Sequence, residues 1–429
     1  MNSPSPDTYA QAVPERPAPA PSNMPYADRV GFVVELARRL HSYGTTAQRL
    51  EGAIIAVARK FGLRCQPWSN PTGMILSFAE AGTATPLHDT TQVIRLEPGG
   101  VELGKLCDAD AIAEDVMAGR RNIAEGSSAL QELDRPAGWK MMAQEVFCFG
   151  LSAASVAGLL RNSWADIAAA GLIGLLVGLI YAAGSGRPRL LEAEEALVAF
   201  IATLLTAAIA TFVIPLTTKT VLIAAIIVLM PGLTLTNAVS ELSSQHLVSG
   251  TARFGGALAT LIKLTFGTLA AMQLVRVLGW HPHEAVEHRT RQWVEWAALL
   301  ASAYAFAVLF RARLRDYPLV MAAAAFGYLV TRWCGSRLGN DAGVFFGSMA
   351  VSAASNAYAR WAKRPGALIR VPGIILLVPG SVSFRSLTSV LERDLMLGLN
   401  TAAAVMSVLV ALVAGVLFGN LLVATRRNL

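Results

Sequence analysis

The feature that most limits the fold of this chain is a series of long apolar segments that fills the sequence after residue 140. A helix needs roughly 20 apolar residues to cross about 30 Å of hydrocarbon, and ten segments approach that length. These segments are residues 143–160, 166–184, 195–214, 219–236, 251–276, 293–310, 317–334, 342–360, 371–387 and 397–424. Because 54% of the chain is apolar and only 15% is charged, the sequence predicts an all-α integral membrane core of ten helices.

The first 140 residues have the composition of a soluble protein. Residues 1–27 are rich in proline and have no apolar core, so we expect a disordered tail and no cleaved secretory signal. Helical periodicity covers residues 28–40, 45–61 and 103–133, and short apolar stretches that suit two strands cover 72–79 and 91–97. The sequence therefore predicts a small soluble α/β domain over residues 28–140.

Loop charges give a modest orientation signal. If this soluble domain is cytoplasmic, the loops and the C-terminus on its side of the membrane carry more Lys and Arg than the opposite loops. We therefore expect a multi-pass protein of the cell (inner, cytoplasmic) membrane with its N-terminal domain inside. The net charge of +7 comes from these scattered residues, which form no basic stripe, so we expect no nucleic-acid partner.

An internal repeat is the strongest organising feature after the apolar segments. The string IIVLMPG ends at Gly232 and recurs as IILLVPG ending at Gly380, an offset of 148 residues (380 minus 232). The same offset, without a gap, pairs Leu247 with Leu395, Gly250 with Gly398, Leu264 with Leu412, Gly267 with Gly415 and Val275 with Val423. Two Pro-Gly breaks and two further glycines in one register indicate a duplication.

The duplication predicts an inverted arrangement. We place the first five-helix repeat at 141–280, a polar connecting loop at 281–292 and the second repeat at 293–429. A unit with an odd number of spans inserts its copy upside down, so the core should be a 5+5 inverted repeat. This arrangement is typical of secondary transporters, in which paired, interrupted helices mark a binding site near the membrane midplane.

The two Pro-Gly breaks are the candidate binding site. Proline removes a backbone donor and glycine relaxes the chain, so each break frees polar backbone groups that need partners at membrane depth. Short polar side chains follow both breaks and suit the ammonium and carboxylate groups of a zwitterion. The candidate substrate-binding residues are Pro231, Gly232, Thr234, Thr236, Asn237, Pro379, Gly380, Ser381 and Ser383. The alternative is a kink whose hydroxyl groups bond only the carbonyls of their own helix.

Three ionisable residues at membrane depth are candidates for ion coupling. Lys263 lies near the middle of the fifth segment, where an unpaired charge is costly, so it should face a cavity or a partner. Glu145 and Asp166, at the starts of the first two segments, are candidates for that partner or for carrying protons. Alternatively, these carboxylates anchor helix ends in the interface, and the Lys263 side chain extends to the membrane surface.

Two further patterns carry weaker signals. Asn356 with Ser348, Ser352 and Ser355 forms one polar face on the eighth segment, a pattern that more often serves helix packing than solute binding. Loop 281–288 has residue types of a metal site but no helical HExxH pattern, and the four cysteines have no ligand spacing. We expect neither a metal nor another cofactor.

The chain resembles the threonine/serine exporter family over roughly residues 30–425. The match rests on MPGLTLTNAVSELSSQHLVSGTAR after the first break, on SYGTTAQRLEGAI in the soluble domain, and on PGIILLVPGSVSF in the second half. The resemblance implies proton-driven export of threonine and serine by a soluble domain fused to ten membrane helices. One departure is Arg385, which stands where the first half has Asn237, so the two half-sites differ.

These observations favour a secondary exporter of threonine, serine or a similar small amino acid, with protons and the lipid bilayer as further partners. Arg49 and Glu51 of the soluble domain are candidates for a cytoplasmic gate. The alternatives are an exporter of another small carboxylate such as a dicarboxylate, a passive channel, or a membrane-anchored sensor. No nucleophile elbow, P-loop or dinucleotide fingerprint occurs, so we expect no enzyme, and a homo-oligomer stays open.

Overall fold

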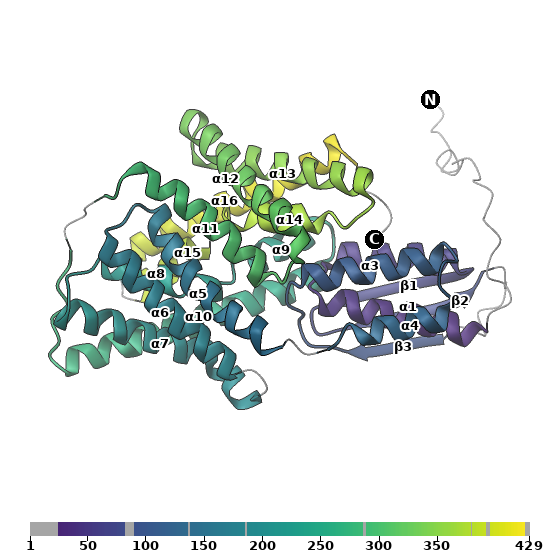
Figure 1. Ribbon diagram of the computed structural model, residues 1–429, viewed down its shortest axis with the longest axis horizontal. Coiled ribbons are helices and arrows are strands. Elements are labelled where there is room, and N and C mark those ends of the chain that lie inside the picture. The colour runs from purple at the N-terminus through teal and green to yellow at the C-terminus, as the bar shows by residue number, and fades with distance from the viewer. Residues whose placement is uncertain are drawn as a thin grey trace, which may run out of the picture.

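The structure is a computed structural model that describes residues 25–81, 90–135, 138–184, 187–285, 289–378, 380–391 and 395–424. Most of the predicted tail, residues 1–27, lies outside these ranges, and the first helix already begins at Tyr26. Figure 1 shows two parts, an N-terminal unit (residues 25–135) that contains the sheet and a larger helical bundle (residues 138–424).

The N-terminal unit packs four helices with one small sheet. It comprises α1 (Tyr26–Ser42), α2 (Ala47–Lys60), β1 (Leu63–Asn70), β2 (Gly73–Glu80), β3 (Thr90–Arg95), α3 (Leu103–Met117) and α4 (Ile123–Glu132). The strands are antiparallel in the order β1-β2-β3. Phe32 of α1, Ile54 of α2, Phe78 of β2 and Leu130 of α4 are fully buried in a shared core, so this unit has a core of its own.

One prediction for this unit was wrong in detail. The sheet has three strands rather than two, and the additional strand, β1, alternates buried and exposed residues and contains Pro67, which an edge strand tolerates. The periodic stretch 103–133 is helical, as predicted, and forms the two helices α3 and α4. Gly119, with φ of 72°, follows the end of α3, and the Asn122 side chain caps α4 by accepting a 2.7 Å hydrogen bond from Glu125 N.

The helical bundle contains several long helices and two interrupted ones. Its helices are α5 (Trp139–Leu159), α6 (Trp164–Gly184), α7 (Pro188–Phe212), α8 (Thr218–Ala225), α9 (Gly232–Ser243), α10 (Leu247–Val277), α11 (Gln292–Leu309), α12 (Tyr317–Leu338), α13 (Asn340–Ala362), α14 (Ala367–Ile375), α15 (Gly380–Leu391) and α16 (Leu395–Leu422). The pair α8–α9 is bent by 56° and contains the first Pro-Gly break, and the second break separates α14 from α15.

The bundle has the composition of a multi-pass membrane protein. Within the described ranges, seven helical segments are long and apolar enough to cross a membrane, and the bent pair α8–α9 would make eight. The sequence predicts ten, and the two that fall short are α12 and α13. In α13 the polar residues Ser348, Ser352, Ser355 and Asn356 reduce the apolar character, and all four are buried. The single polar face predicted for this helix is therefore confirmed.

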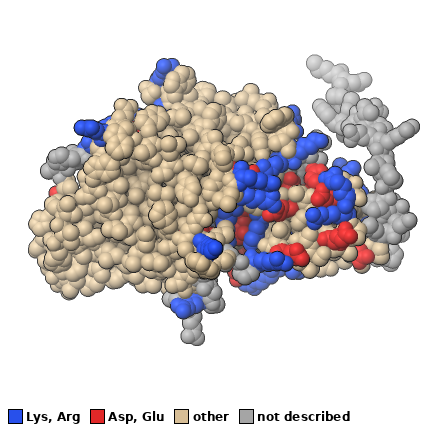
Figure 2. Space-filling model, in the orientation of Figure 1, with Lys and Arg blue, Asp and Glu red and all other residues tan. Residues whose placement is uncertain are grey.

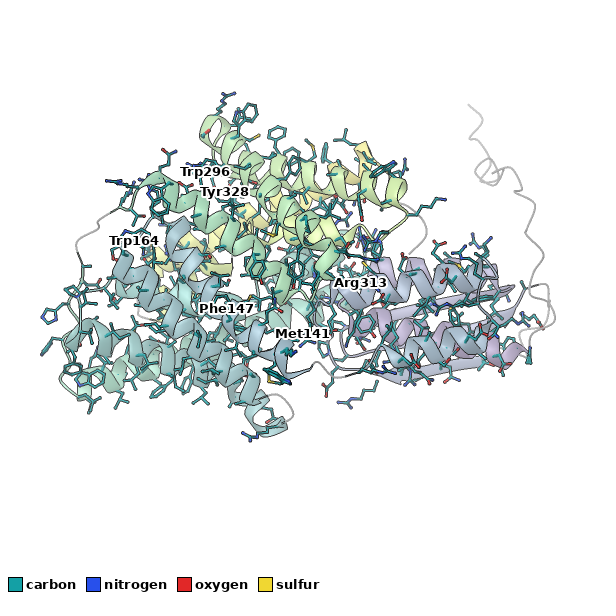
Figure 3. All side chains as sticks on the ribbon, in the orientation of Figure 1. Met141, Phe147, Trp164, Trp296, Arg313 and Tyr328 are labelled. Atoms are coloured by element: carbon teal, nitrogen blue, oxygen red, sulfur yellow. The ribbon has the colours of Figure 1, made fainter. Side chains whose placement is uncertain are left out.

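The composition of the surface also differs between the N-terminal unit and the bundle. In Figure 2 the charged side chains gather over the N-terminal unit, while the visible face of the bundle is almost free of them. Exposed apolar side chains such as Leu172 and Phe266 cover the bundle, as contact with lipid tails requires. Trp164 and Trp296 lie at the end of the bundle farthest from the N-terminal unit (Figure 3), where tryptophans suit a membrane–water interface.

The 148-residue offset of the sequence repeat also relates the positions at which helices begin. The corresponding starts, 148 residues apart, are Gly232 of α9 with Gly380 of α15 and Leu247 of α10 with Leu395 of α16. Two matched glycines also pack alike. A β-carbon on Gly267 would lie 2.1 Å from Ala196 O, and one on Gly415 would lie 2.3 Å from Phe345 O, so both helices touch a neighbouring backbone there.

The C-terminal ends of α5 and α11 lie at opposite ends of the bundle. Helices α5 and α11 are each followed by an arginine with left-handed backbone, Arg161 (φ 58°) and Arg311 (φ 48°). Arg161 donates to Thr290 O at 2.7 Å, whereas Arg311 donates to Glu102 of the N-terminal unit at 2.9 Å. In Figure 3, Trp164 lies at the distant end of the bundle and Arg313 lies at the junction with the N-terminal unit.

The N-terminal unit is joined to the bundle through the starts of two of its helices. Ala47 N, in the first turn of α2, donates to Glu241 of α9 at 2.9 Å. Leu103 N and Gly104 N, which open α3, donate to Phe310 O and Arg311 O at 2.9 and 3.0 Å. Because helix N-termini have unsatisfied N–H groups, partners from the bundle satisfy them and fix the unit in place.

Glu241 is the centre of the α2 junction. It is 1% exposed and also accepts hydrogen bonds from Ser249 at 2.7 Å and from Arg253 at 2.9 Å. We expect Glu241→Ala to leave Arg253 without this carboxylate and to weaken the junction by about 1.5–3 kcal/mol, the usual contribution of hydrogen bonds to charged groups.

Amide hydrogen exchange of the purified protein tests this prediction. Exchange over residues 45–52 should accelerate by roughly 10- to 100-fold in Glu241→Ala. Glu132→Ala is the control, since Glu132 is exposed and pairs only distantly with Arg135, at 3.9 Å. Unchanged exchange at the start of α2 in a folded Glu241→Ala variant would show that the carboxylate does not hold the junction.

Candidate functional site

A cavity of about 520 Å³ lies between the N-terminal unit and the helical bundle. One wall comes from α2, the segment before it and the start of α3, and the other comes from α9, α13, α14 and α16. We call it the interface cavity. It brings together side chains from the N-terminal unit and from both halves of the bundle, so it is the candidate functional site.

The two helix breaks meet beside this cavity. A β-carbon on Gly232 would lie 3.3 Å from Gly380 Cα, and one on Gly380 would lie 3.3 Å from Gly232 Cα. The backbones therefore lie close together, and a β-carbon on Gly232 would also meet Val378 Cγ1 at 2.4 Å, so the glycines favour this approach. Pro231 is buried at the start of α9, and Pro379 lies outside the described residues.

Polar side chains that follow the first break line the interface cavity. Thr236, Asn237 and Ser240 line it from α9. The Thr236 hydroxyl donates to Gly232 O at 3.2 Å, so it bonds its own helix, as the alternative interpretation expected. Asn237 has no hydrogen bond with the described residues, so its amide is available to a solute.

The remaining predicted binding residues lie elsewhere. Thr234 is half-buried and is not part of the cavity lining. In the second half, Ser381 is half-buried and Ser383 is buried, and neither lines the cavity. The second half instead contributes side chains from α13, α14 and α16, so the cavity has no two-fold symmetry.

Sequence reasoning missed the most unusual residue of the cavity, Arg370 of α14. Its Nη2 donates to Asn356 Oδ1 at 3.0 Å and to Asn420 Oδ1 at 3.1 Å. Among the described residues it forms no ion pair, and its Nε has no hydrogen-bond partner. The predicted span began at residue 371, one position later, so Arg370 was counted as a loop charge.

The asparagine partners of Arg370 form a network of neutral groups. Asn356 Nδ2 donates to Asn420 Oδ1 and to Val423 O, both at 2.8 Å. Ser352 Oγ donates to the same Asn420 oxygen at 3.1 Å. The polar face of α13 therefore serves this network and not helix packing alone.

The two candidate gate residues of α2 point to different partners. Arg49 lines the interface cavity, and burial lowers the pKa of its guanidinium to about 10, so it remains protonated at neutral pH. Glu51 accepts hydrogen bonds from Ser69 N at 2.8 Å and contacts His246 Nε2 of the bundle at 3.2 Å. Arg49 therefore belongs to the cavity, and Glu51 belongs to the junction between the two parts.

Lys263 has a partner, but it is neither Glu145 nor Asp166. Its Nζ lies 3.3 Å from Glu195 Oε2, on α7, which packs against α10. Both residues lie in segments that are long and apolar enough to cross the membrane. Glu195 was overlooked because it stood at the boundary of the predicted third span, where a charge needs no partner.

Glu145 and Asp166 make structural contacts. Glu145 accepts from Arg311 Nε at 2.6 Å, at the junction with the N-terminal unit. Asp166 is 1% exposed and accepts hydrogen bonds from Ser163 Oγ, Thr217 N and Thr217 Oγ1, each at 2.8 Å. Such bonds join the start of α6 to the start of α8, as expected of a carboxylate that anchors a helix end.

Residues 31–275 match a family described as "Putative threonine/serine exporter", and residues 296–422 match one described as "Threonine/Serine exporter, ThrE". No solved structure matches the chain.

Curated relatives are fungal proteins. Pheromone-regulated membrane protein 10 of Yarrowia lipolytica is 26% identical over 372 residues, which cover 83% of this chain and 30% of the relative. The protein of the same name in Eremothecium gossypii is 24% identical, over 88% of this chain and 52% of the relative. An uncharacterized protein of Schizosaccharomyces pombe is 24% identical, over 83% and 48%. The chain thus spans about a third to a half of the length of these relatives.

The two family matches together take in the N-terminal unit and both halves of the bundle, and they are separated only by the connecting segment. The chain therefore belongs to the threonine/serine exporter family.

Proposed function

We propose that the protein is a secondary active exporter of threonine, serine or a similar small amino acid. Its solute would bind in the interface cavity, beside the paired breaks at Gly232 and Gly380. The observation that carries this proposal is the position of Asn237, whose amide faces the cavity five residues after the first break. A cavity of about 520 Å³ holds such a solute together with several waters.

The transport mechanism we propose is alternating access in a 5+5 inverted repeat of ten helices. Support comes from the 148-residue offset shared by the starts of α9 and α15, and of α10 and α16. Further support comes from Arg161 and Arg311, which follow equivalent helices at opposite ends of the bundle. An inverted repeat can open to one side or the other by exchanging the conformations of its halves.

The proposed location is the cytoplasmic membrane with the N-terminal unit in the cytoplasm. In this orientation the interface cavity is on the cytoplasmic side, where an exporter takes up its solute. Loop charges and the highly charged surface of the N-terminal unit in Figure 2 are consistent with it. We also propose that the soluble part covers residues 28–140, and the start of α5 at Trp139 supports this limit.

Transport in proteoliposomes tests the function. Labelled threonine and serine should accumulate against their gradients when a proton gradient is imposed, and should only equilibrate without it. A passive channel equilibrates in both cases, and a membrane-anchored sensor moves no solute at all.

Asn237 provides a direct test of the site. We expect Asn237→Ala to weaken threonine transport by roughly 2- to 10-fold, because one hydrogen bond between uncharged groups contributes about 0.5–1.5 kcal/mol. Ser243→Ala is the matched control, since Ser243 lies on the same helix but is exposed and bonds only Val239 O. Equal initial rates for Asn237→Ala and wild type would remove Asn237 from the site.

Ion coupling, which we also propose, is assigned to the Lys263–Glu195 pair. Lys263→Met leaves Glu195 without its cation at membrane depth, where an unpaired charge is costly. We expect loss of proton-driven accumulation, while exchange of labelled for unlabelled threonine continues. Lys219→Met, at an exposed position in the first turn of α8, should behave as wild type. If Lys263→Met accumulates threonine normally, the pair is purely structural.

A further inference from the structure

The interface cavity has an excess of positive charge that its own walls do not neutralise. Its lining contains three arginines, Arg49, Arg59 and Arg370, and one aspartate, Asp110, which gives a formal charge of +2. Arg59 is exposed, whereas Arg49 and Arg370 are half-buried and line the cavity. A partly buried pair of like charges is unfavourable unless an anion joins it.

Arg370 is held in place by groups that cannot neutralise it. Asn356 and Asn420 accept its hydrogen bonds through amide oxygens, which orient the guanidinium but have no charge. Only Nη2 is used in these bonds, and a guanidinium has five N–H donors. Its Nε and Nη1 have no hydrogen bond with any described residue, so some donors of this guanidinium are unpaired.

Arg364 shows the contrasting arrangement a short distance away. Its Nη1 and Nη2 donate to the two carboxylate oxygens of Asp316, each at 2.7 Å. This two-pronged pair joins the loop between α13 and α14 to the residue before α12, and it lies outside the cavity lining. The same stretch of chain therefore contains one arginine, Arg364, that is paired with a carboxylate of the protein, and one, Arg370, that has no such partner among the described residues.

Arg49 brings a second guanidinium to the cavity from the N-terminal unit. It is close enough to Arg370 for the two charges to repel each other, and it forms no ion pair with the described residues. Its position depends on the junction, because α2, which carries it, starts at the hydrogen bond from Ala47 N to Glu241. The two arginines reach the cavity from opposite walls.

We propose that Arg370 and Arg49 together bind the carboxylate group of the transported solute, so that the N-terminal unit supplies one half of the binding site. This inference rests on the proposed function for the identity of the solute. A carboxylate fits because its negative charge offsets both guanidinium groups, and each of its two oxygens can accept a hydrogen bond from one of them. The ammonium or hydroxyl groups of an amino acid would then face Asn237 and Ser240 on α9.

One consequence is a linkage between solute binding and docking of the N-terminal unit. Because the carboxylate contacts both walls, a bound solute bridges them, and it repels neither arginine. Binding must strengthen the junction by the same factor by which the junction strengthens binding. The N-terminal unit would leave the cavity more readily when the cavity is empty, which gives the unit a direct role in uptake of solute.

The test is binding by the purified full-length protein, measured by calorimetry with L-threonine. Arg370→Gln and Arg49→Gln should each weaken binding by roughly 10- to 100-fold, as expected for lost hydrogen bonds between charged groups. Arg385→Gln on α15 and Arg38→Gln on α1, both at exposed positions, are the controls and should bind as wild type. Threoninol, which has the ammonium but no carboxylate, should bind wild type no better than the variants.

Stability of the ligand-free protein separates a binding arginine from a structural one. Because Arg370 has no carboxylate in the described structure, Arg370→Gln should leave the melting temperature unchanged or raise it, whereas Arg364→Gln should lower it by breaking the pair with Asp316. If Arg370→Gln also lowers the melting temperature, Arg370→Lys is the second variant, because it keeps the positive charge but loses the guanidinium group. Arg370→Lys should fold and should still bind threonine more weakly than wild type.

The outcomes distinguish this inference from the proposed function. Threonine binding without transport would contradict the exporter and leave the inference supported. Transport with unchanged threonine affinity in Arg370→Gln and Arg49→Gln would overturn the inference and leave the exporter. If wild type binds no threonine, L-serine and succinate are the carboxylate probes, and failure of all three to bind overturns the inference as well.

Discussion

The contact between the two helix breaks is the interaction on which the rest of the bundle depends. Hydrocarbon offers no hydrogen-bond partners, so an interrupted helix is tolerated only where protein or water surrounds the break. Here each break is the other's neighbour, and the absence of side chains at Gly232 and Gly380 lets the backbones touch. This placement keeps the freed backbone groups inside the protein, and it directs the polar face of α9 toward the interface cavity.

Helix α9 also connects the site to the N-terminal unit. Its residues Thr236, Asn237 and Ser240 line the cavity, and Glu241, the next residue, holds the start of α2. Any movement of α9 would therefore shift the N-terminal unit as well. The unit is thus mechanically coupled to the helical bundle, because its attachment and the candidate site share one helix.

The features that were predicted from the sequence are those that depend on local composition. Apolar length predicts most of the membrane helices, and the Pro-Gly register predicts both breaks and the starts of α9 and α15. What was missed depends on tertiary contacts. Glu195 pairs with Lys263 across two helices, and Arg370 meets Asn356 and Asn420 from different segments. No residue spacing in the sequence predicts either contact, and both Glu195 and Arg370 stood at the boundaries of predicted spans.

The two halves of the sequence differ at the cavity. At the repeat offset of 148, the positions that correspond to Arg370, Asn356 and Asn420 are the apolar residues 222, 208 and 272. Conversely, Thr236 and Asn237 correspond to Phe384 and Arg385. The Pro-Gly pairs are thus common to both halves, whereas the polar residues of the cavity are not. The binding arrangement that we propose accounts for this difference, because a solute with one carboxylate needs guanidinium groups on one side and neutral polar groups on the other.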